Sequence, residues 1–274
     1  MHNSISYHGY TKLDEEQSAK FYQNTLDLDF YENQYIIAGN DDLYKYKNGN
    51  THRVNFQTIN NNWEGQIKPL DTEQLALIDM LGDRDSKVKV VRGVYGSGKD
   101  YLMFNKALSL VDSGEFDKII FVRPNVTVAN VPAIGFLPDG IDQKLAWTLA
   151  PLYDKVGGKE GVDQLIGRHK LEMVPLLFIR GRSFENSIIY VTEAQNIDSE
   201  IAKLILGRIG DNSELWLNGD NHQTDNRIFD KDNGLTKMVD RLKGNSLFSY
   251  VYLPNTHRSN VANLANLLDD EDII

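Results

Sequence analysis

The chain has 274 residues, a formal net charge of −10 and a hydrophobic content of 41%, which predict one large domain with an appendage or two smaller domains. It contains no cysteine, which excludes disulfide bonds and thiolate metal sites. No apolar run reaches the about 20 residues of a membrane span and no signal-like leader opens the chain, so we expect a cytoplasmic protein without a membrane partner.

The amino-terminal part of the chain predicts small β-strands. Residues 1–30 are polar with a moderately helical pattern. Three strand-like runs follow, at 34–37, 43–46 and 53–56. The intervening residues 39–42 and 47–50 combine Gly, Asn and Asp, which favour tight turns. We therefore expect residues 1–65 to form a small β-containing extension.

The pattern changes after Asn60–Asn62, three asparagines that indicate a linker. From residue 66 onward, short apolar runs alternate with helical patterns. The apolar runs lie at 118–122, 187–191 and 214–218. Buried apolar strands separated by helices predict a parallel sheet that helices cover on both faces. Residues 66–274 are thus expected to form one doubly wound, mostly parallel α/β domain.

Residues Gly93–Asp100 carry the most informative motif of the chain. They spell GVYGSGKD, a phosphate-binding loop of the form GxxxxGK that ends in Asp100 where Ser or Thr is usual. Val88–Val91 predicts a strand before the loop, and residues 101–110 predict a helix after it. Such a strand, loop and helix aim backbone N–H groups at phosphate. We favour a nucleotide-binding loop over the alternative, a glycine turn without a ligand.

Polar residues also follow two predicted strands and precede the loop. Glu193 lies in Thr192–Asn196 after one strand, and Asn218–Gln223 begins at the end of another. Carboxylates and amides at strand ends suit metal binding and water positioning, although each alone is also a common helix cap. Upstream, the amide of Gln74 suits an adenine edge. The predicted nucleotide contacts are Gln74, Gly93, Tyr95, Gly96, Ser97, Gly98, Lys99, Asp100 and Tyr101.

In these segments the chain resembles the PhoH-like ATPases, a family related to the superfamily 1 helicase core. The matching segments are 66–74, 93–99, 123–124, 135–138, 152–153, 175–176, 178–183, 193–196, 208–210 and 219–220, with Gln223 and Asp225. Arg-Gly-Arg at 180–182 and Glu-Ala-Gln-Asn at 193–196 are the most specific. Residues 33–62 look like the linker of members in which a PIN-type nuclease precedes the ATPase. The resemblance implies a short form without that nuclease, as is typical of bacteria and their phages.

The resemblance implies roles for individual residues. Lys99 and the loop amides hold the triphosphate, and Glu193 polarises the attacking water. Gln223 senses the γ-phosphate, and Gln74 reads adenine. Arginines supply charge to the transition state; the candidates are Arg123, Arg180, Arg182, Arg208 and Arg258, of which Arg208 and Arg258 complete the predicted catalytic set. Ordinary surface ion pairing explains any single one of these arginines equally well.

Two positions depart from the family pattern, which has Ser or Thr at 100 and Asp at 192. Asp100 and Thr192 have exchanged carboxylate and hydroxyl. Because these positions face each other across one Mg²⁺ in the implied fold, we expect a retuned site in which Asp100, Thr192 and Glu193 serve the metal. The alternative is a decayed site, because Asp100 brings a negative charge close to the phosphates.

Together these inferences predict a Mg²⁺-dependent ATPase coupled to RNA or single-stranded nucleic acid, of RNA helicase type, with ATP and Mg²⁺ as cofactors. We also expect a homo-oligomer in the form of a hexameric ring. The net charge of −10 disfavours tight non-specific binding to duplexes. Two alternatives stay open: a nucleotide-binding switch or scaffold with little hydrolysis, and a kinase of a small metabolite that uses the same loop.

Overall fold

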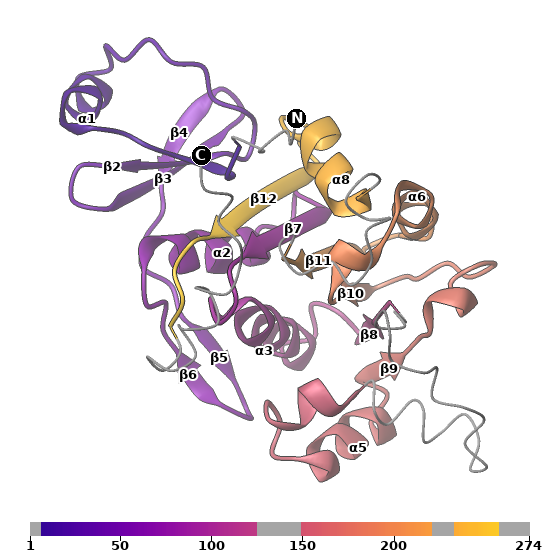
Figure 1. Cartoon of the computed structure of the whole chain (residues 1–274). Coiled ribbons are helices and arrows are strands. Elements are labelled where there is room, and N and C mark those ends of the chain that lie inside the picture. Colours follow the sequence, from indigo (N-terminus) through magenta and orange to yellow (C-terminus); the bar gives the residue numbers. More distant parts are fainter. Residues whose placement is uncertain (1–6, 125–148, 221–232, 258–274) are drawn as a thin grey trace, which may run out of the picture. The chain divides into compact units, whose positions relative to one another are not determined.

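This computed structural model describes residues 7–124, 149–220 and 233–257 (Figure 1). They belong to two compact units, the first drawn from residues 1–58, 68–99 and 238–274 and the second from 59–67 and 100–237. The expected division into residues 1–65 and 66–274 stays a prediction. Of the helices in the described residues, none is both long and apolar enough to cross a membrane.

The amino-terminal residues of the first unit form a four-stranded sheet. Its order is β1 (Tyr10–Lys12), β2 (Tyr35–Ala38), β3 (Asp42–Lys47) and β4 (Asn50–Arg53). β1 pairs parallel with β2, and the other pairs are antiparallel. Helix α1 (Glu15–Tyr22) is capped by Asp14, which forms a capping box with Gln17. The predicted strands at 34–37 and 43–46 are confirmed.

The predicted strand at 53–56 is wrong, because β4 ends at Arg53. A two-residue turn, Asn48–Gly49, joins β3 to β4, and Lys47 pairs with Asn50. Both turn residues have positive φ, 52° and 78°, as in the type I′ turn that matches the twist of paired strands. Because this turn fixes the register, strand pairing begins at Asn50.

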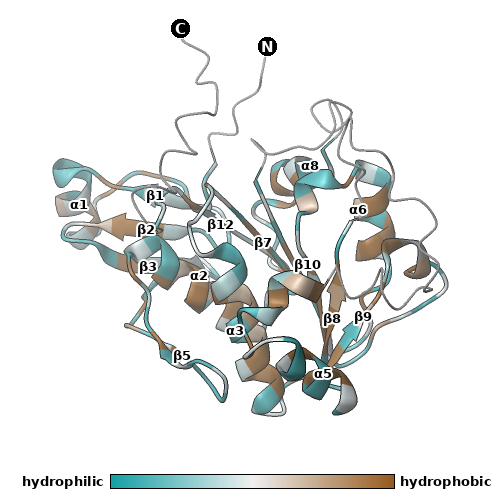
Figure 2. Cartoon of the chain, turned by 60° about the horizontal axis from the view of Figure 1, so that its bottom comes forward, coloured by the Kyte–Doolittle hydropathy of each residue, from teal (hydrophilic) through white to brown (hydrophobic). Residues whose placement is uncertain are grey.

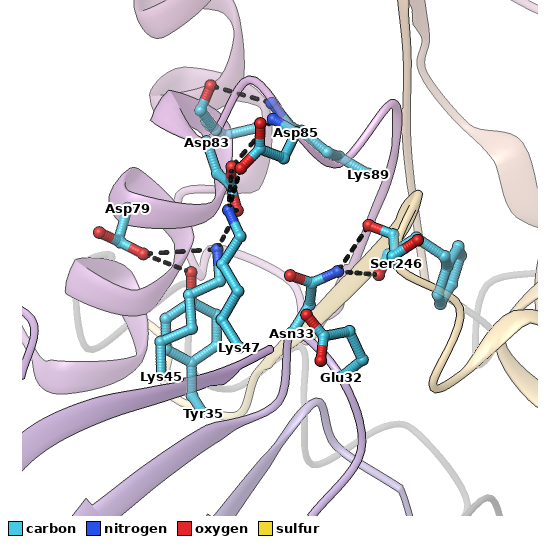
Figure 3. Close-up of polar contacts among 12 residues, drawn as sticks. Glu32, Asn33, Tyr35, Lys45, Lys47, Asp79, Asp83, Asp85, Lys89 and Ser246 are labelled. Atoms are coloured by element: carbon cyan, nitrogen blue, oxygen red, sulfur yellow. Dashed lines mark hydrogen bonds and ion pairs between the residues drawn. The ribbon is translucent and has the colours of Figure 1, made fainter. Parts of the chain in front are cut away.

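A network of charged side chains joins β3 to the end of helix α2 (Thr72–Gly82) within the first unit (Figure 3). The ammonium groups of Lys45 and Lys47 both bind Asp83, and Tyr35 Oη donates to Asp79 Oδ2 at 2.7 Å. Burial alone would raise the pKa of Asp83, but the two ammonium groups hold that pKa below its ordinary value. The network therefore stabilises the unit only while Asp83 is ionised.

We expect Asp83→Asn to lower the free energy of unfolding by about 3 kcal/mol at pH 7, because buried Lys45 loses its nearest carboxylate and keeps only that of Asp79, at 3.8 Å. Asp85→Asn is the control, because Asp85 is 75% exposed and its loss should cost less than about 1 kcal/mol. Since folding lowers the pKa of Asp83, its contribution is complete above the unfolded pKa of about 3.9 and is lost as pH falls through the folded value. Urea unfolding at pH 7 and in acid measures both effects. Equal losses for the two variants at pH 7 would contradict this assignment.

A parallel pair of strands, β7 (Val88–Gly93) and β12 (Phe248–Leu253), completes the first unit, and α2 packs on both. The predicted strand before the phosphate loop is confirmed. The sequence pattern did not predict β12. In the register of this pair Leu253 lies opposite Gly93, so β12 borders the start of the loop.

Four parallel strands form the sheet of the second unit. Their order is β11 (Glu214–Gly219), β10 (Ser187–Val191), β8 (Lys118–Val122) and β9 (Leu171–Met173). β10 and β11 are buried along their whole length, and Figure 2 shows the apolar character of β8 in brown. The three predicted runs at 118–122, 187–191 and 214–218 are confirmed, and β9 is an addition to them.

Helices alternate with these strands along the chain. They are α3 (Lys99–Asp112), α5 (Lys159–Gly167), α6 (Ser199–Leu206) and α8 (Gly234–Leu242). The strands β7 and β12 of the first unit are parallel in the same way. The predicted fold class, a parallel α/β P-loop sheet with a small β-containing extension, is confirmed.

Residues 59–67 of the second unit form a hairpin of β5 (Ile59–Asn61) and β6 (Gly65–Ile67). Asn61 Nδ2 donates to Asn105 Oδ1 in α3 at 2.7 Å, and Asn62 Nδ2 donates to Asp112 Oδ2 at 3.1 Å. The predicted linker at Asn60–Asn62 is therefore wrong. Its amide side chains fasten the hairpin to α3.

Candidate nucleotide site

The phosphate loop joins β7 to α3, and hydrogen bonds of the first unit hold its backbone. Gly96 has a φ of 75°, a region that glycine adopts without strain. Val94 N–H donates to Leu253 O at 3.1 Å, and His257 N–H donates to Gly96 O at 3.0 Å. A Cβ on Gly93 would lie 2.6 Å from Leu253 O, so glycine is required there. The loop is thus bonded to β12 and to the residues that follow it.

Two polar side chains of the loop lie close to the loop's own backbone. Lys99 Nζ donates to Gly93 O at 2.7 Å and to Val94 O at 3.0 Å. Ser97 is 1% exposed, and its Oγ has no hydrogen-bond partner among the described residues. The loop therefore holds the ammonium group that a phosphate needs.

Three other predicted contacts flank these residues. Gly98 has a φ of 86°, and Tyr95 and Tyr101 are partly exposed. Tyr101 belongs to the second unit, where its Oη donates to Glu64 Oε2 at 3.3 Å. Contact of these residues with a nucleotide stays a prediction.

Gln74 lies in the first turn of α2, and its side chain is buried. Its Nε2 donates to Ser97 O at 3.1 Å, and its Oε1 accepts from Leu70 N–H at 2.9 Å. The side chain thus connects the phosphate loop to α2. Its predicted adenine contact stays a prediction.

Asp71, the N-cap of α2, makes a second connection that the sequence analysis missed. Its Oδ1 accepts from Gln74 N–H at 2.7 Å. Its Oδ2 accepts from Asn255 Nδ2 at 3.1 Å and lies 2.8 Å from His257 Nε2. The only local signal was a capping aspartate, and the partners of its second oxygen lie more than 180 residues away in the sequence.

In the second unit, the side chain of Asp100 lies at the carboxyl ends of β10 and β11. Its Oδ1 accepts from Tyr190 Oη at 2.7 Å, Thr192 Oγ1 at 2.9 Å and Asn218 Nδ2 at 2.8 Å. Asn218 Nδ2 also donates to Tyr190 Oη at 2.6 Å. The two exchanged positions, Asp100 and Thr192, are therefore in direct contact. Tyr190 had no role in the sequence analysis, because it lies inside an apolar strand.

Asp100 is an ionised acceptor in this network. Burial alone would raise the pKa of Asp100, but the nearby ammonium group of Lys155 and the three donors hold that pKa below its ordinary value. Burial and the charge of Asp100 raise the pKa of Tyr190 well above its ordinary value, so the phenol stays a donor. Asp100 therefore carries a fixed negative charge directly after Lys99 in the chain.

Glu193 follows β10 in a strained backbone conformation, with a φ of 53°. Side chains other than glycine are uncommon in this region and concentrate at functional sites. Its Oε2 accepts from Gln195 Nε2 at 2.7 Å, and its Oε1 lies 3.9 Å from Arg123 Nη2. The side chain is 41% exposed. Glu193 is therefore an oriented carboxylate that solvent can reach.

Comparison with known proteins assigns the chain to a family, because the family model described as "PhoH-like protein" matches residues 66–265. The chain belongs to the PhoH-like family. Protein PhoH2 of Thermobispora bispora is 32% identical over 202 residues, 72% of this chain and 46% of that protein. Protein PhoH2 of Bacillus subtilis is 31% identical over 210 residues, 73% and 47% of the two chains. The chain thus spans about half the length of the curated relatives it matches.

A solved structure, "Sulfolobus solfataricus SWI2/SNF2 ATPase core in complex with dsDNA", matches 64% of this PhoH-like chain and 36% of that chain. The TM-score is 0.37 and the sequence identity 14%. A match at this TM-score is too weak to support a conclusion about the present chain.

The predicted arginines of this PhoH-like chain have different surroundings. Arg182 Nη2 lies 2.7 Å from Glu172 Oε1, and its guanidinium lies over the ring of Phe184, so ordinary ion pairing explains it. Arg208 follows α6, and no hydrogen bond or ion pair joins it to Glu193 within the described ranges. Its catalytic role stays a prediction. Arg180 is exposed.

Two members of the predicted catalytic set, Gln223 and Arg258, lie outside the described residues, as does the matching segment 135–138. Their roles stay predictions.

The side-chain oxygens at Asp100 suit a cation that keeps water and phosphate as its other ligands. Within the part of the chain that the structure describes, no group of three or more His, Cys, Asp or Glu residues forms a metal site. Asp100 and Thr192 offer a carboxylate and a hydroxyl, and Mg²⁺ prefers such hard oxygen donors. Because Mg²⁺ usually binds through one or two carboxylates, substrate phosphates and waters, this donor set suits it.

Proposed function

We propose that this chain is a Mg²⁺-dependent ATPase whose hydrolysis is coupled to RNA or single-stranded nucleic acid. Membership of the PhoH-like family supports nucleotide binding and hydrolysis. The observation that carries the proposal is the exposed, oriented carboxylate of Glu193 in a chain that also has a fastened phosphate loop. Such a carboxylate can orient and polarise a water molecule for attack on a phosphoryl group.

The loop supplies the phosphate contacts in this proposal. Lys99 Nζ donates to two loop carbonyls, and an ammonium group has three donors that can exchange those carbonyls for phosphate oxygens. Gln74 and His257 hold other loop carbonyls. Because the loop is fixed before the ligand arrives, less conformational entropy is lost on binding.

Hydrolysis needs a base and a charge partner in the same place. Gln195 sets the direction of Glu193, whose carboxylate then accepts a hydrogen bond from water. The 3.9 Å separation between Arg123 Nη2 and Glu193 Oε1 is too long for a hydrogen bond. Arg123 can therefore turn its donors to charge that develops on the γ-phosphate. Bound Mg²⁺ would neutralise phosphate charge; Asp100 would hold it, supported by the hydroxyl of Thr192.

The nucleic-acid partner and the assembly rest on the resemblance to the family. The net charge of −10 weighs against tight non-specific binding to duplexes, so we propose single strands held in a local channel. A homo-oligomeric ring whose subunits lend an arginine to a neighbour, and a cytoplasmic location in bacterial or phage-infected cells, complete the proposal. Light scattering of the purified chain measures the oligomer.

Steady-state phosphate release from ATP tests the proposal. We expect turnover that needs Mg²⁺ and rises when single-stranded RNA is added. Glu193→Gln should lower turnover by about 10²–10⁴-fold, the usual contribution of a positioned base, and should leave nucleotide affinity close to that of the wild type. Glu200→Gln is the matched control, because Glu200 is 79% exposed on α6, and it should keep full turnover.

The outcomes separate the proposal from its alternatives. Tight nucleotide binding without turnover would support a switch or scaffold and contradict hydrolysis. Turnover that RNA and single-stranded DNA leave unchanged would contradict the coupling alone. Transfer of phosphate to a metabolite in place of water would support a kinase.

A further inference from the structure

The two oxygens of the Asp100 carboxylate have different surroundings. Oδ1 accepts three hydrogen bonds, from Tyr190, Thr192 and Asn218. Within the described residues, no donor is placed on Oδ2, and Asp100 as a whole is half-buried. One oxygen is therefore anchored, and the other keeps its lone pairs for a ligand.

The three donors form a closed network. Asn218 Nδ2 donates to both Asp100 Oδ1 and Tyr190 Oη, and Tyr190 Oη in turn donates to Asp100 Oδ1. Tyr190 and Asn218 are 1% and 2% exposed, so neither can turn away without losing its partner in a buried place. A network satisfied in this way fixes the orientation of the group it holds. The direction of Oδ2 is thus set in advance.

A purely structural role does not account for this arrangement. A neutral acceptor would satisfy the same three donors without a charge. The charge of Asp100 follows Lys99 directly in the chain, where it would repel a polyphosphate unless a cation lay between them. The arrangement therefore indicates a site that binds a cation together with an anionic ligand.

We propose that Asp100 Oδ2 is a direct ligand of the divalent cation that accompanies the nucleotide, and that Tyr190, Thr192 and Asn218 are positioning residues for it. The inference rests on the proposed function. An ordinary phosphate-binding loop offers the metal a neutral hydroxyl at this position. Here the ligand is a charge, so nucleotide affinity depends on the metal more steeply.

The test measures the affinity for a non-hydrolysable ATP analogue by calorimetry, once with excess Mg²⁺ and once with EDTA. In Asp100→Asn, the amide oxygen can still accept the three hydrogen bonds while an NH₂ group replaces Oδ2. The variant should bind the Mg²⁺-loaded analogue more weakly than the wild type and the metal-free analogue more tightly. The ratio of the two affinities should fall about 100-fold. Asp112→Asn, at the exposed end of the same helix, is the control and should keep the wild-type ratio.

Tyr190→Phe tests the positioning role separately. It removes one donor from Oδ1 and leaves the charge in place. We expect the ratio to fall by about 3–10-fold, without any gain in metal-free binding. A gain in EDTA equal to that of Asp100→Asn would contradict a positioning role.

An unchanged ratio in Asp100→Asn, or metal-free binding no tighter than in the wild type, would overturn the inference. If circular dichroism shows that this variant does not fold, Asp100→Ser repeats the measurement under the same criteria. A wild-type ratio below about tenfold would overturn the inference without any variant. Failure of the wild type to bind the analogue with Mg²⁺ would instead overturn the proposed function.

Discussion

Lys99→Ala should weaken nucleotide binding and lower ATP turnover by at least about 10²–10³-fold, the cost of removing one donor from developing charge. The ammonium group donates to Gly93 O and Val94 O at the start of the loop. The variant therefore loses both the charge that we propose for phosphate binding and two contacts that hold the loop. Calorimetry with the ATP analogue and phosphate release measure the two effects.

Lys203→Ala is the control for this prediction, because Lys203 is 69% exposed on α6. It should match the wild type in both measurements, since exposed ion pairs contribute about 0–1 kcal/mol. Turnover of Lys99→Ala within tenfold of the wild type would show that the loop does not hold the reacting phosphates. A lowered melting temperature with normal turnover would assign Lys99 to loop structure alone.

Restoring the usual order of the exchanged pair gives the second large effect. In Asp100→Thr alone, the buried donors Tyr190 and Asn218 lose a carboxylate acceptor, at about 1–3 kcal/mol for each unsatisfied group. In Thr192→Asp alone, two carboxylates meet where Thr192 Oγ1 and Asp100 Oδ1 are 2.9 Å apart. At about 4 Å and an effective dielectric constant of about 20, that repulsion is about 4 kcal/mol.

The double variant Asp100→Thr with Thr192→Asp should recover part of these losses. It again places one hydroxyl against one carboxylate, with the direction of the hydrogen bond reversed. We expect a coupling energy of about 2–3 kcal/mol in unfolding experiments, at the upper end for residues in contact. Turnover should follow the same pattern, low in each single variant and higher in the double.

Additivity is the outcome that would contradict this prediction. If the losses of the two single variants simply add in the double variant, the contact between positions 100 and 192 carries no interaction energy. Asp100→Thr combined with Glu200→Gln is the control pair, since Glu200 is 79% exposed and bonds to Lys203. That pair should be additive within about 0.5 kcal/mol.

Periodicity predicted the strands whose residues are buried on both faces. β8, β10 and β11 are short apolar runs, and such runs are typical of strands in a parallel sheet that is covered on both faces. β9 has only three residues and owes its existence to pairing with β8, a contact that no local pattern encodes. β12 alternates apolar and polar residues less regularly, and its pairing with β7 decides its conformation.

Parts of the site were predictable for a different reason. The loop motif and the exchange between Asp100 and Thr192 are visible in the residue types, and the contact between the pair agrees with that pattern. Asn218 was part of a predicted strand-end segment, but its partners and the role of Tyr190 were not predictable, because they depend on the register of β10 against β11. Asp71 and His257 meet across the length of the chain, and only the folded structure brings them together.

The hydrogen bonds that hold the phosphate loop also favour the binding of an anion over a cation. Two of its carbonyl oxygens have donors that lie outside the loop: Gly96 O accepts from His257 N–H, and Ser97 O accepts from Gln74 Nε2. Carbonyl oxygens are the part of a backbone that repels an anion, and here the protein keeps them occupied. Gln74 and His257 can therefore raise the affinity for a polyphosphate without contacting it. Each neutralises part of the negative charge on a carbonyl oxygen that would otherwise repel the ligand.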